Sequence, residues 1–384
     1  MTVERKPRVL FVGAFPSAGS AIFGGMVTSC RALLQSSFPA RLDLDLIDST
    51  QISHPPPGVL VRALFAVRRM LTFIWRFERK RPDAVLLFVA VGASVAEKGA
   101  MSWYARLRGR PALMFLRGGP LIKACADSRF TRFWTKAAIG GASKVLCQGP
   151  AWQKFAVDVL GFTLRESPIV PNWTASDAML AIGDARTTSD ASSPVRILFV
   201  GWLDREKGIL ELLSACKQLS LSRRFTLDLV GEGNSTPDAR DFVLRNGLQN
   251  FIQFHGWLHG AKLEQRYREA DVFVLPSWAE GLPNAMIEAM AAKLAVLVTA
   301  IGNIPDVIED GVTGLLVPPR DVKVLTQALA RMIDEPALRE SLAQAGHDKA
   351  RAEFSVEPAV ERLISGIQDA MVPTGPTIGK RKFK

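Results

Sequence analysis

Short apolar runs alternate with segments of helical period along the whole chain of 384 residues. The first half offers six candidate buried strands, at Arg8–Val12, Asp43–Ile47, Ala84–Val89, Ala112–Leu116, Lys144–Gln148 and Ser167–Val170. The second half offers five more, at Arg196–Val200, Thr226–Val230, Ile252–Phe254, Val272–Leu275 and Ala295–Thr299. Continuous runs of Val, Ile, Leu and Phe bounded by Gly or Pro are typical of parallel strands buried on both faces. The alternation with helices predicts an α/β fold with two doubly wound parallel sheets.

A stretch over residues 176–194 separates the two series of strands. It is rich in Ala, Ser, Thr and Asp and has no sustained hydrophobic period, which is typical of a linker. We therefore expect a first domain over 1–175 and a second over 195–354, with a ligand cleft between the carboxyl ends of their strands. A helix over 355–371 is expected to pack back on the first domain, and a basic tail over 372–384 is expected to be disordered.

Charge is distributed unevenly between the two halves. Residues 1–176 carry 24 Lys and Arg against 10 Asp and Glu, whereas residues 177–384 carry 24 against 27. This asymmetry predicts that the first domain meets an anionic partner, and nucleic acid and an anionic membrane are both candidates. A composition of 48% hydrophobic and 22% charged residues excludes general disorder.

Cysteine and histidine indicate no metal centre. The four cysteines are scattered, which favours a reducing compartment, and the four histidines form no helix-spaced ligand pair. The longest apolar stretch, 84–96, is shorter than the roughly 18 residues of a membrane span. The basic and apolar N-terminus, 5–13, is interpreted as a buried strand in preference to a secretion signal. We therefore expect a cytoplasmic protein, with peripheral attachment to the inner face of the cytoplasmic membrane as the further option.

Two glutamates flank a predicted helix start in the second half. A buried strand is expected to end at Pro276-Ser277, and a helix to begin near Pro283. The backbone amides within 282–285 would then form an open helix N-terminus, which suits a phosphate. Carboxylates beside such a site, here Glu280 and Glu288, would hydrogen-bond sugar hydroxyls. The alternative is two solvated surface carboxylates.

These residues resemble a known signature. Glu280 and Glu288, inside Pro-Ser-x-x-Glu-Gly-Leu-Pro and Glu-Ala-Met-Ala, look like the motif of retaining glycosyltransferases of family GT4, the glycosyl transferases group 1 domain. The resemblance is strong from about 196 to 325 and includes 302–308 and 310–319. It implies the GT-B fold, in which two Rossmann-like domains face each other across a cleft. It also implies that Glu280 contacts the donor sugar and Glu288 the nucleotide ribose. The residues implied at the rest of the donor site are Gly281, Leu282, Pro283, Asn284 and Ala285.

A loop over 201–208 is the second candidate element of the donor site. It follows a strand and opens a helix, so backbone amides and Lys207 converge on one anion position. In the family this loop binds the donor diphosphate through an Arg and a Lys, and Lys207 matches the Lys. The usual Arg position is Trp202 here, and Arg205 is the candidate substitute. The alternative is a helix-cap loop with incidental charges.

The first half resembles the family less closely. Phe23-Gly24-Gly25-Met26 looks like the glycine-rich loop near the donor phosphates, so Gly24 and Gly25 are assigned to donor binding. Where many relatives have a histidine, the chain has Arg117, which donates hydrogen bonds but is no general base. A retaining transfer needs no enzymic base if the departing phosphate oxygen accepts the acceptor's proton, so Arg117 stays a catalytic candidate. Asp43-Leu44-Asp45 imitates a metal-binding DxD, but its alternation predicts a half-exposed strand and no metal.

A basic amphipathic helix is predicted over Leu60–Arg81. Its arginines Arg62, Arg69 and Arg76 recur every seven residues. A second face carries Leu60, Leu64, Val67, Leu71 and Ile74. One hypothesis is docking of the arginines on anionic lipid. The other is an ordinary helix whose apolar stripe packs on the sheet and whose basic face is solvated.

The leading hypothesis is a retaining GT-B glycosyltransferase that uses a nucleoside-diphosphate sugar and no metal or other cofactor. Glu280, Lys207 and Arg117 are its catalytic candidates. The expected acceptor is a lipid-linked or other saccharide in the synthesis of bacterial exopolysaccharide, capsule or lipopolysaccharide. Two hypotheses from other classes are a catalytically silent sugar-nucleotide-binding module and a nucleic-acid-binding protein, although no recognised motif supports the latter. An epimerase on the same fold is disfavoured by the glutamate pair.

Overall fold

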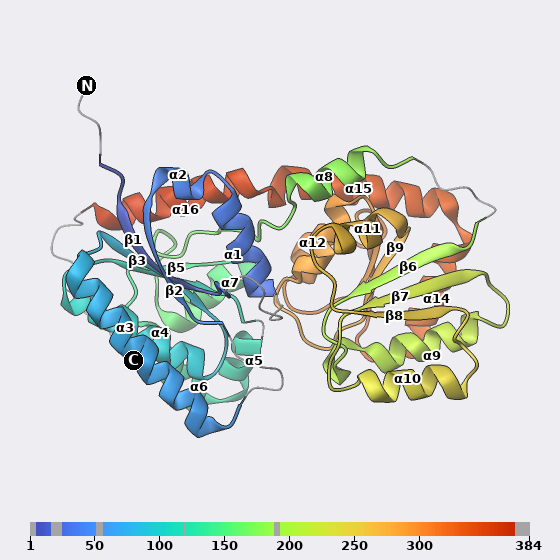
Figure 1. Cartoon of the computed structure of the whole chain (residues 1–384), viewed down its shortest axis with the longest axis horizontal. Coiled ribbons are helices and arrows are strands. Elements are labelled where there is room, and N and C mark those ends of the chain that lie inside the picture. The colour runs from blue at the N-terminus through green and yellow to red at the C-terminus, as the bar shows by residue number, and fades with distance from the viewer. Residues whose placement is uncertain (1–4, 17–24, 51–56, 119, 188–192, 373–384) are drawn as a thin grey trace. The chain divides into compact units, whose positions relative to one another are not determined.

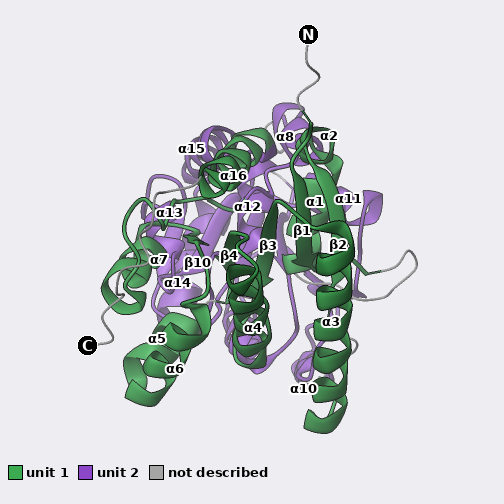
Figure 2. Cartoon of the chain, turned by 90° about the vertical axis from the view of Figure 1, so that its left-hand side faces the viewer, with its two compact units in different colours: residues 1–22, 26–172, 357–384 green, residues 23–25, 173–356 purple. Residues whose placement is uncertain are grey.

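The computed structural model describes residues 5–16, 25–50, 57–118, 120–187 and 193–372, and Figure 1 labels their elements. The chain divides into two compact units. Unit 1 comprises 1–22, 26–172 and 357–384, and unit 2 comprises 23–25 and 173–356 (Figure 2). Each unit is built around one parallel sheet with helices on its faces, so the α/β fold with two doubly wound sheets is confirmed.

The sheet of unit 1 has five strands, all of whose neighbours are parallel. Their spatial order is β2 (Asp43–Asp48), β1 (Arg8–Gly13), β3 (Ala84–Val89), β4 (Ala112–Leu116) and β5 (Lys144–Leu146). All residues of the two central strands β3 and β4 are buried, which explains their continuous apolar sequences. The helices of this unit are α1 (Gly25–Gln35), α2 (Phe38–Arg41), α3 (Val59–Lys80), α4 (Ala93–Leu107), α5 (Pro120–Asp127), α6 (Arg129–Ile139) and α7 (Pro150–Phe155).

The sheet of unit 2 has six strands, again with parallel neighbours. Their order is β11 (Leu315–Val317), β10 (Ala295–Thr299), β9 (Val272–Leu275), β6 (Val195–Val200), β7 (Phe225–Val230) and β8 (Ile252–Gly256). Its helices are α8 (Asp177–Asp184), α9 (Ile209–Leu219), α10 (Thr236–Arg245), α11 (Ala261–Glu269), α12 (Asn284–Ala291), α13 (Ile304–Val307), α14 (Val322–Asp334) and α15 (Pro336–Phe354). Because β6 and β9 are adjacent, the loops after these two strands meet at one edge of the sheet.

The last helix, α16 (Val356–Met371), belongs to unit 1 from Glu357 onward. The Glu357 carboxylate accepts a hydrogen bond from the backbone N–H of Ser37 at 3.0 Å. Asp369, near the other end of the helix, lies 3.4 Å from the Lys144 ammonium group. The chain therefore leaves unit 1 after residue 172 and returns to it with this helix.

Two expected segments differ from the structure. The expected linker over 176–194 contains helix α8, because Met179, Leu180 and Ile182 are buried in the core of unit 2; the division between the units falls at 172–173 instead. The expected strand 167–170 is reduced to a single bridge between Cys147 and Ile169. Strand β11 was not predicted. The expected basic tail, beyond residue 372, lies outside the described residues.

Candidate functional site

An ion pair joins the ends of two neighbouring strands of unit 2. Lys207 ends the short 3-10 turn Arg205–Lys207 that follows β6, and Glu280 lies in the loop after β9. The Lys207 Nζ is 2.5 Å from the Glu280 Oε1, and the two side chains are 25% and 11% exposed. Partly desolvated charges interact more strongly than solvated ones. The pair is therefore a fixed feature of the carboxyl edge of this sheet, and its cation is still accessible.

Glu280 is held by a second donor. The Ser277 hydroxyl donates to its Oε1 at 2.9 Å, and the Thr299 hydroxyl at the end of β10 donates to the Ser277 carbonyl oxygen at 2.6 Å. Two donors on one carboxylate oxygen fix its direction and leave the other oxygen available to a ligand hydroxyl. The alternative of a solvated surface glutamate is therefore wrong for Glu280. Sequence reasoning placed Ser277 in the motif without giving it a role, and it missed Thr299, which comes from β10.

Two glycines bring the loops around this pair into close contact. Gly208 has a φ of +70°, and a Cβ there would lie 2.0 Å from the Pro276 carbonyl oxygen. Gly302 has a φ of +56°, and a Cβ there would lie 2.2 Å from the Glu280 carbonyl oxygen. Both positions combine a left-handed backbone with contact on a main-chain oxygen, which only glycine tolerates.

We expect Gly302→Ala to destabilise unit 2 by about 1–3 kcal/mol or more, because it combines backbone strain with a clash on the Glu280 carbonyl. Gly311→Ala is the matched control, since Gly311 has a φ of +75° but no atom within 4 Å of its Cβ position. Thermal denaturation of both variants separates the loss of Tm caused by backbone strain from the loss caused by the steric clash. Equal losses of Tm would show that the two loops do not meet as closely as described.

The second glutamate of the motif is buried. Glu288 lies on α12, is 9% exposed, and accepts a hydrogen bond at 2.8 Å from the hydroxyl of the fully buried Tyr267 on α11. Burial raises the pKa of Glu288 to about 7. Burial and the neighbouring carboxylate raise the pKa of Tyr267 well above its ordinary value. The alternative of a solvated helix glutamate is therefore wrong for Glu288 as well. No sequence pattern linked Tyr267 to it.

The start of α12 follows Glu280 directly. The helix begins at Asn284, and Pro283 stands one position before it and supplies no side-chain cap. The Gly281 carbonyl oxygen accepts from the backbone N–H of Asn303 at 2.9 Å. Asn303 is 3% exposed, and its side-chain NH₂ has no hydrogen-bond partner in the part of the chain that the structure describes. A buried donor of this kind is available to a bound ligand. Sequence reasoning gave Asn303 no role.

Aromatic rings surround the remaining loop residues. The Arg205 guanidinium lies 5.7 Å from the centre of the Trp278 ring, and that of Arg320 lies 4.2 Å from it. Trp202, at the position expected for an arginine, packs edge-on against Trp257 with ring centres 4.6 Å apart. Arg205 is exposed and oriented by Trp278, and its substitution for the missing arginine stays a prediction.

Of the candidates in the first half, Gly24 is outside the described residues, Gly25 is assigned to unit 2, and Arg117 lies in unit 1. Gly25 is the first residue of α1. The Arg117 guanidinium donates to the Ser29 hydroxyl at 2.7 Å and stacks 5.0 Å from the centre of the Phe115 ring. Burial lowers the pKa of Arg117 to about 10, so the group still carries its charge at neutral pH. Its role in the reaction stays a prediction.

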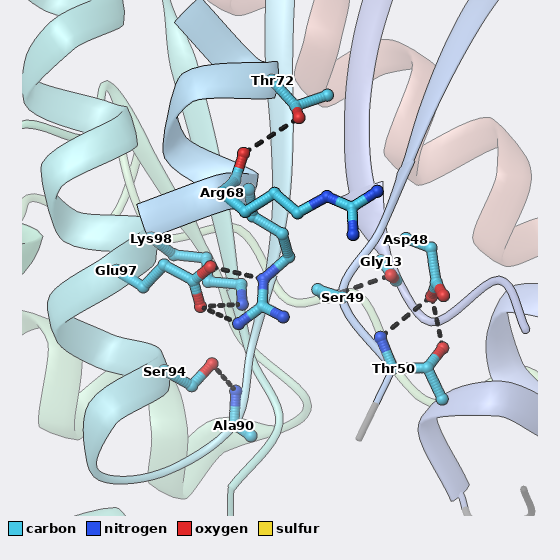
Figure 3. A network of polar contacts seen from close by, with 11 residues as sticks. Gly13, Asp48, Ser49, Thr50, Arg68, Thr72, Ala90, Ser94, Glu97 and Lys98 are labelled. Atoms are coloured by element: carbon cyan, nitrogen blue, oxygen red, sulfur yellow. Dashed lines mark hydrogen bonds and ion pairs between the residues drawn. The ribbon is translucent and has the colours of Figure 1, made fainter. Parts of the chain in front are cut away.

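Two of the three arginines predicted to form a basic stripe on α3 are paired with carboxylates of unit 1. Figure 3 shows Glu97 and Lys98 of α4 side by side in a polar network. Arg69 donates to both oxygens of Glu97, at 2.6 and 3.1 Å, and the Lys98 Nζ lies 2.8 Å from the same carboxylate. Arg76 is tied to Asp45 at 2.8 Å. Arg69 and Arg76 therefore neutralise carboxylates of their own unit and form no solvated basic face with Arg62.

No helix in the described part of the chain is long and apolar enough to cross a membrane. In the same residues, no cluster of three or more His, Cys, Asp and Glu side chains is arranged to hold a metal ion.

Residues 194–335, which contain the Lys207–Glu280 pair and Glu288, match the family model of glycosyl transferases group 1. This region is related to group 1 glycosyltransferases. A putative colanic acid biosynthesis glycosyltransferase, WcaL of Salmonella typhimurium, is 29% identical over 192 residues, or 48% of this chain and 47% of the relative. The matches to the first curated relatives span less than half of those proteins' length.

Solved structures resemble nearly the whole chain. Sucrose-phosphate synthase from Thermosynechococcus elongatus has a TM-score of 0.76 at 20% identity and covers 95% of this chain and 99% of its own. HepE of Anabaena, in complex with UDP and glucose, has a TM-score of 0.69 at 17% identity and covers 94% and 99%. At such low identity the likeness shows the fold alone, which is that of the GT-B glycosyltransferases.

Proposed function

We propose that this protein is a retaining glycosyltransferase of family GT4 that moves a sugar from a nucleoside-diphosphate sugar to a hydroxyl acceptor. The observation that carries the proposal is the Lys207–Glu280 pair, which stands beside the start of α12, while Glu288 is buried just over one turn inside that helix. A cation, an oriented carboxylate and a helix N-terminus at one strand edge suit a ligand with both phosphate and hydroxyl groups.

Each group has a distinct task in the proposed reaction. Lys207 and the amides that open α12 stabilise the charge that develops on the departing diphosphate, which is the largest catalytic contribution we expect. Glu280 accepts hydrogen bonds from the donor sugar, and Glu288 from the ribose. The bond from the anomeric carbon to the phosphate oxygen breaks, and a bond from that carbon to the acceptor oxygen forms. The departing phosphate oxygen takes the acceptor's proton, so no protein base is required, and Arg117 acts as a hydrogen-bond donor.

The acceptor we propose is a lipid-linked saccharide of bacterial surface polysaccharide synthesis, met at the inner face of the cytoplasmic membrane. The basic first half of the chain supports this, and so does the colanic acid biosynthesis relative. The complex of HepE with UDP and glucose makes UDP-sugars the first donors to test.

A thermal-shift screen of UDP-, GDP- and other activated sugars is the direct test. We expect one nucleotide class to raise Tm and the matching sugar to be transferred to a lipid extract with the anomeric configuration of the donor, as read by NMR. An inverted product would contradict the retaining mechanism. No stabilisation by any nucleotide sugar would contradict the function itself.

The second candidate is a sugar-nucleotide-binding module without catalysis. It is favoured by Trp202, which occupies the position of the family's diphosphate-binding arginine and packs against Trp257. Stabilisation by a nucleotide sugar together with no transfer to any acceptor extract would support this module over the enzyme.

A further inference from the structure

Helix α3 presents an apolar stripe to solvent. The side chains of Leu60, Leu64, Val67, Leu71 and Trp75 recur three or four residues apart, which places them on one side of the helix. All of them are 57–86% exposed. Of the apolar stripe expected to pack on the sheet, Ile74 packs against the core of unit 1, whereas Leu60, Leu64, Val67 and Leu71 are exposed. Phe73 and Phe77 attach the helix to the core, and they lie on a different side of it.

The first half of α3 lacks support from its own unit. No residue from Val59 to Arg68 is buried, and the two buried residues of the helix, Phe73 and Phe77, lie in its second half. Figure 2 shows the helix at one edge of unit 1, beside α4. A short apolar helical segment is marginal in water unless it packs against something. This segment is therefore suited to a partner that covers it.

The charge along the helix indicates what that partner is. Between Val59 and Phe77 the helix has no acidic residue. The exposed side chains of Arg68 and Arg79 lie beside the apolar stripe, and the Arg79 guanidinium is 5.6 Å from the centre of the Trp75 ring. The inward arginines, Arg69 and Arg76, are already neutralised by Glu97 and Asp45. A partner that is apolar and carries negative charge at its surface matches this face, and an anionic lipid bilayer has both properties.

Neighbouring helices of unit 1 carry further exposed apolar side chains. Contacts join α4 to both α3 and α6. Exposed large apolar side chains on α4 and α6 are Trp103, Leu107, Phe130, Phe133 and Trp134. In the described part of unit 2, by comparison, only Leu221, Leu244 and Val312 are exposed residues of this kind. Unit 1 therefore carries most of the exposed large apolar side chains of the described chain.

We propose that the apolar stripe of α3 inserts into the interfacial layer of an anionic bilayer, with Arg68 and Arg79 at the lipid headgroups. Burial of the apolar side chains contributes most of the binding free energy, and the arginines add a smaller electrostatic contribution. In docking through a basic stripe, the electrostatic contribution would be the larger one. It deepens the proposed function, because it would hold unit 1 at the surface where a lipid-linked acceptor is found.

The test is sedimentation with vesicles of phosphatidylcholine, alone or mixed with phosphatidylglycerol. We expect the wild-type chain to sediment with the mixed vesicles and the double variant Leu64→Glu/Leu71→Glu to bind them about tenfold more weakly or worse. The matched control is Leu221→Glu/Leu244→Glu, which places the same charges at exposed leucines of unit 2 and is expected to bind as wild type. Circular dichroism checks that both variants are folded.

A charge variant separates the two contributions. Arg68→Gln/Arg79→Gln is expected to bind mixed vesicles more weakly than wild type at low salt and to lose most of that difference at high salt, because screening acts on the headgroup contact. Equal binding of wild type and Leu64→Glu/Leu71→Glu would overturn the proposal. So would a wild type that does not bind anionic vesicles, or a dimer that dissociates on the same double substitution. Sedimentation needs no donor or acceptor, so failure here is distinguishable from failure of the proposed transfer.

Discussion

Replacing Lys207 with alanine is expected to lower kcat/KM for sugar transfer by about 100-fold, or about 2.7 kcal/mol of transition-state stabilisation. The lysine is the cation at the carboxyl edge of β6 and β9, and its ammonium group lies 2.5 Å from Glu280. The charge on a departing diphosphate grows as the reaction proceeds. A fixed cation therefore stabilises the transition state more than it stabilises the bound donor. Its loss should reduce kcat more than it raises KM.

The control for this substitution is Lys217→Ala. Lys217 is an exposed lysine of α9, the helix that starts just after Lys207, so its removal changes the net charge of unit 2 equally. We expect it to leave kcat/KM unchanged. The double variant Lys207→Ala/Glu280→Gln, compared with its single variants, measures how strongly the two side chains are coupled. If Lys207→Ala had the same kcat/KM as the wild type, the assignment of Lys207 to the donor site would be wrong.

The sheets were predictable because parallel strands buried on both faces have continuous apolar sequences. β3, β4, β9 and β10 have the predicted bounds. β11 was missed because its three residues at the sheet edge are too few to form a recognisable run. The linker was misplaced because composition alone does not reveal that Met179, Leu180 and Ile182 are buried in the core of unit 2.

The candidate site was predictable only where its residues lie close together in sequence. Glu280, Glu288 and the start of α12 fall within one short segment. Ser277, which donates to Glu280, lies in the same loop three residues before it, but Thr299, which holds Ser277, comes from β10 and Tyr267 comes from α11. Such contacts depend on tertiary packing. The same limit explains α3, whose amphipathic pattern was evident while the carboxylates that pair with Arg69 and Arg76 were not.

Glu288 is expected to make the stability of unit 2 depend on pH near neutrality. Its pKa is about 7 in the folded chain because of burial, against an ordinary value of 4.5. Below pH 4.5 the carboxyl is protonated in both the folded and unfolded states, so it contributes no pH dependence. Between pH 4.5 and 7 the folded state holds the proton and the unfolded state releases it, so stability falls as pH rises. The loss approaches about 3 kcal/mol above pH 7.

Glu288→Gln should remove this loss, because the amide is neutral at every pH and its carbonyl oxygen still accepts from Tyr267. Urea denaturation at pH 5 and pH 8 measures the effect: wild type should lose stability relative to Glu288→Gln between these two pH values. Glu353→Gln, at an exposed carboxylate of α15, is the matched control and should follow wild type. An equal pH dependence in wild type and Glu288→Gln would mean that the Glu288 carboxyl is ionised in the folded chain well below neutral pH. Tyr267→Phe then separates burial from hydrogen bonding: because the Tyr267 hydroxyl donates to the ionised carboxylate, its removal should raise the pKa of Glu288 further and extend the loss of stability to higher pH.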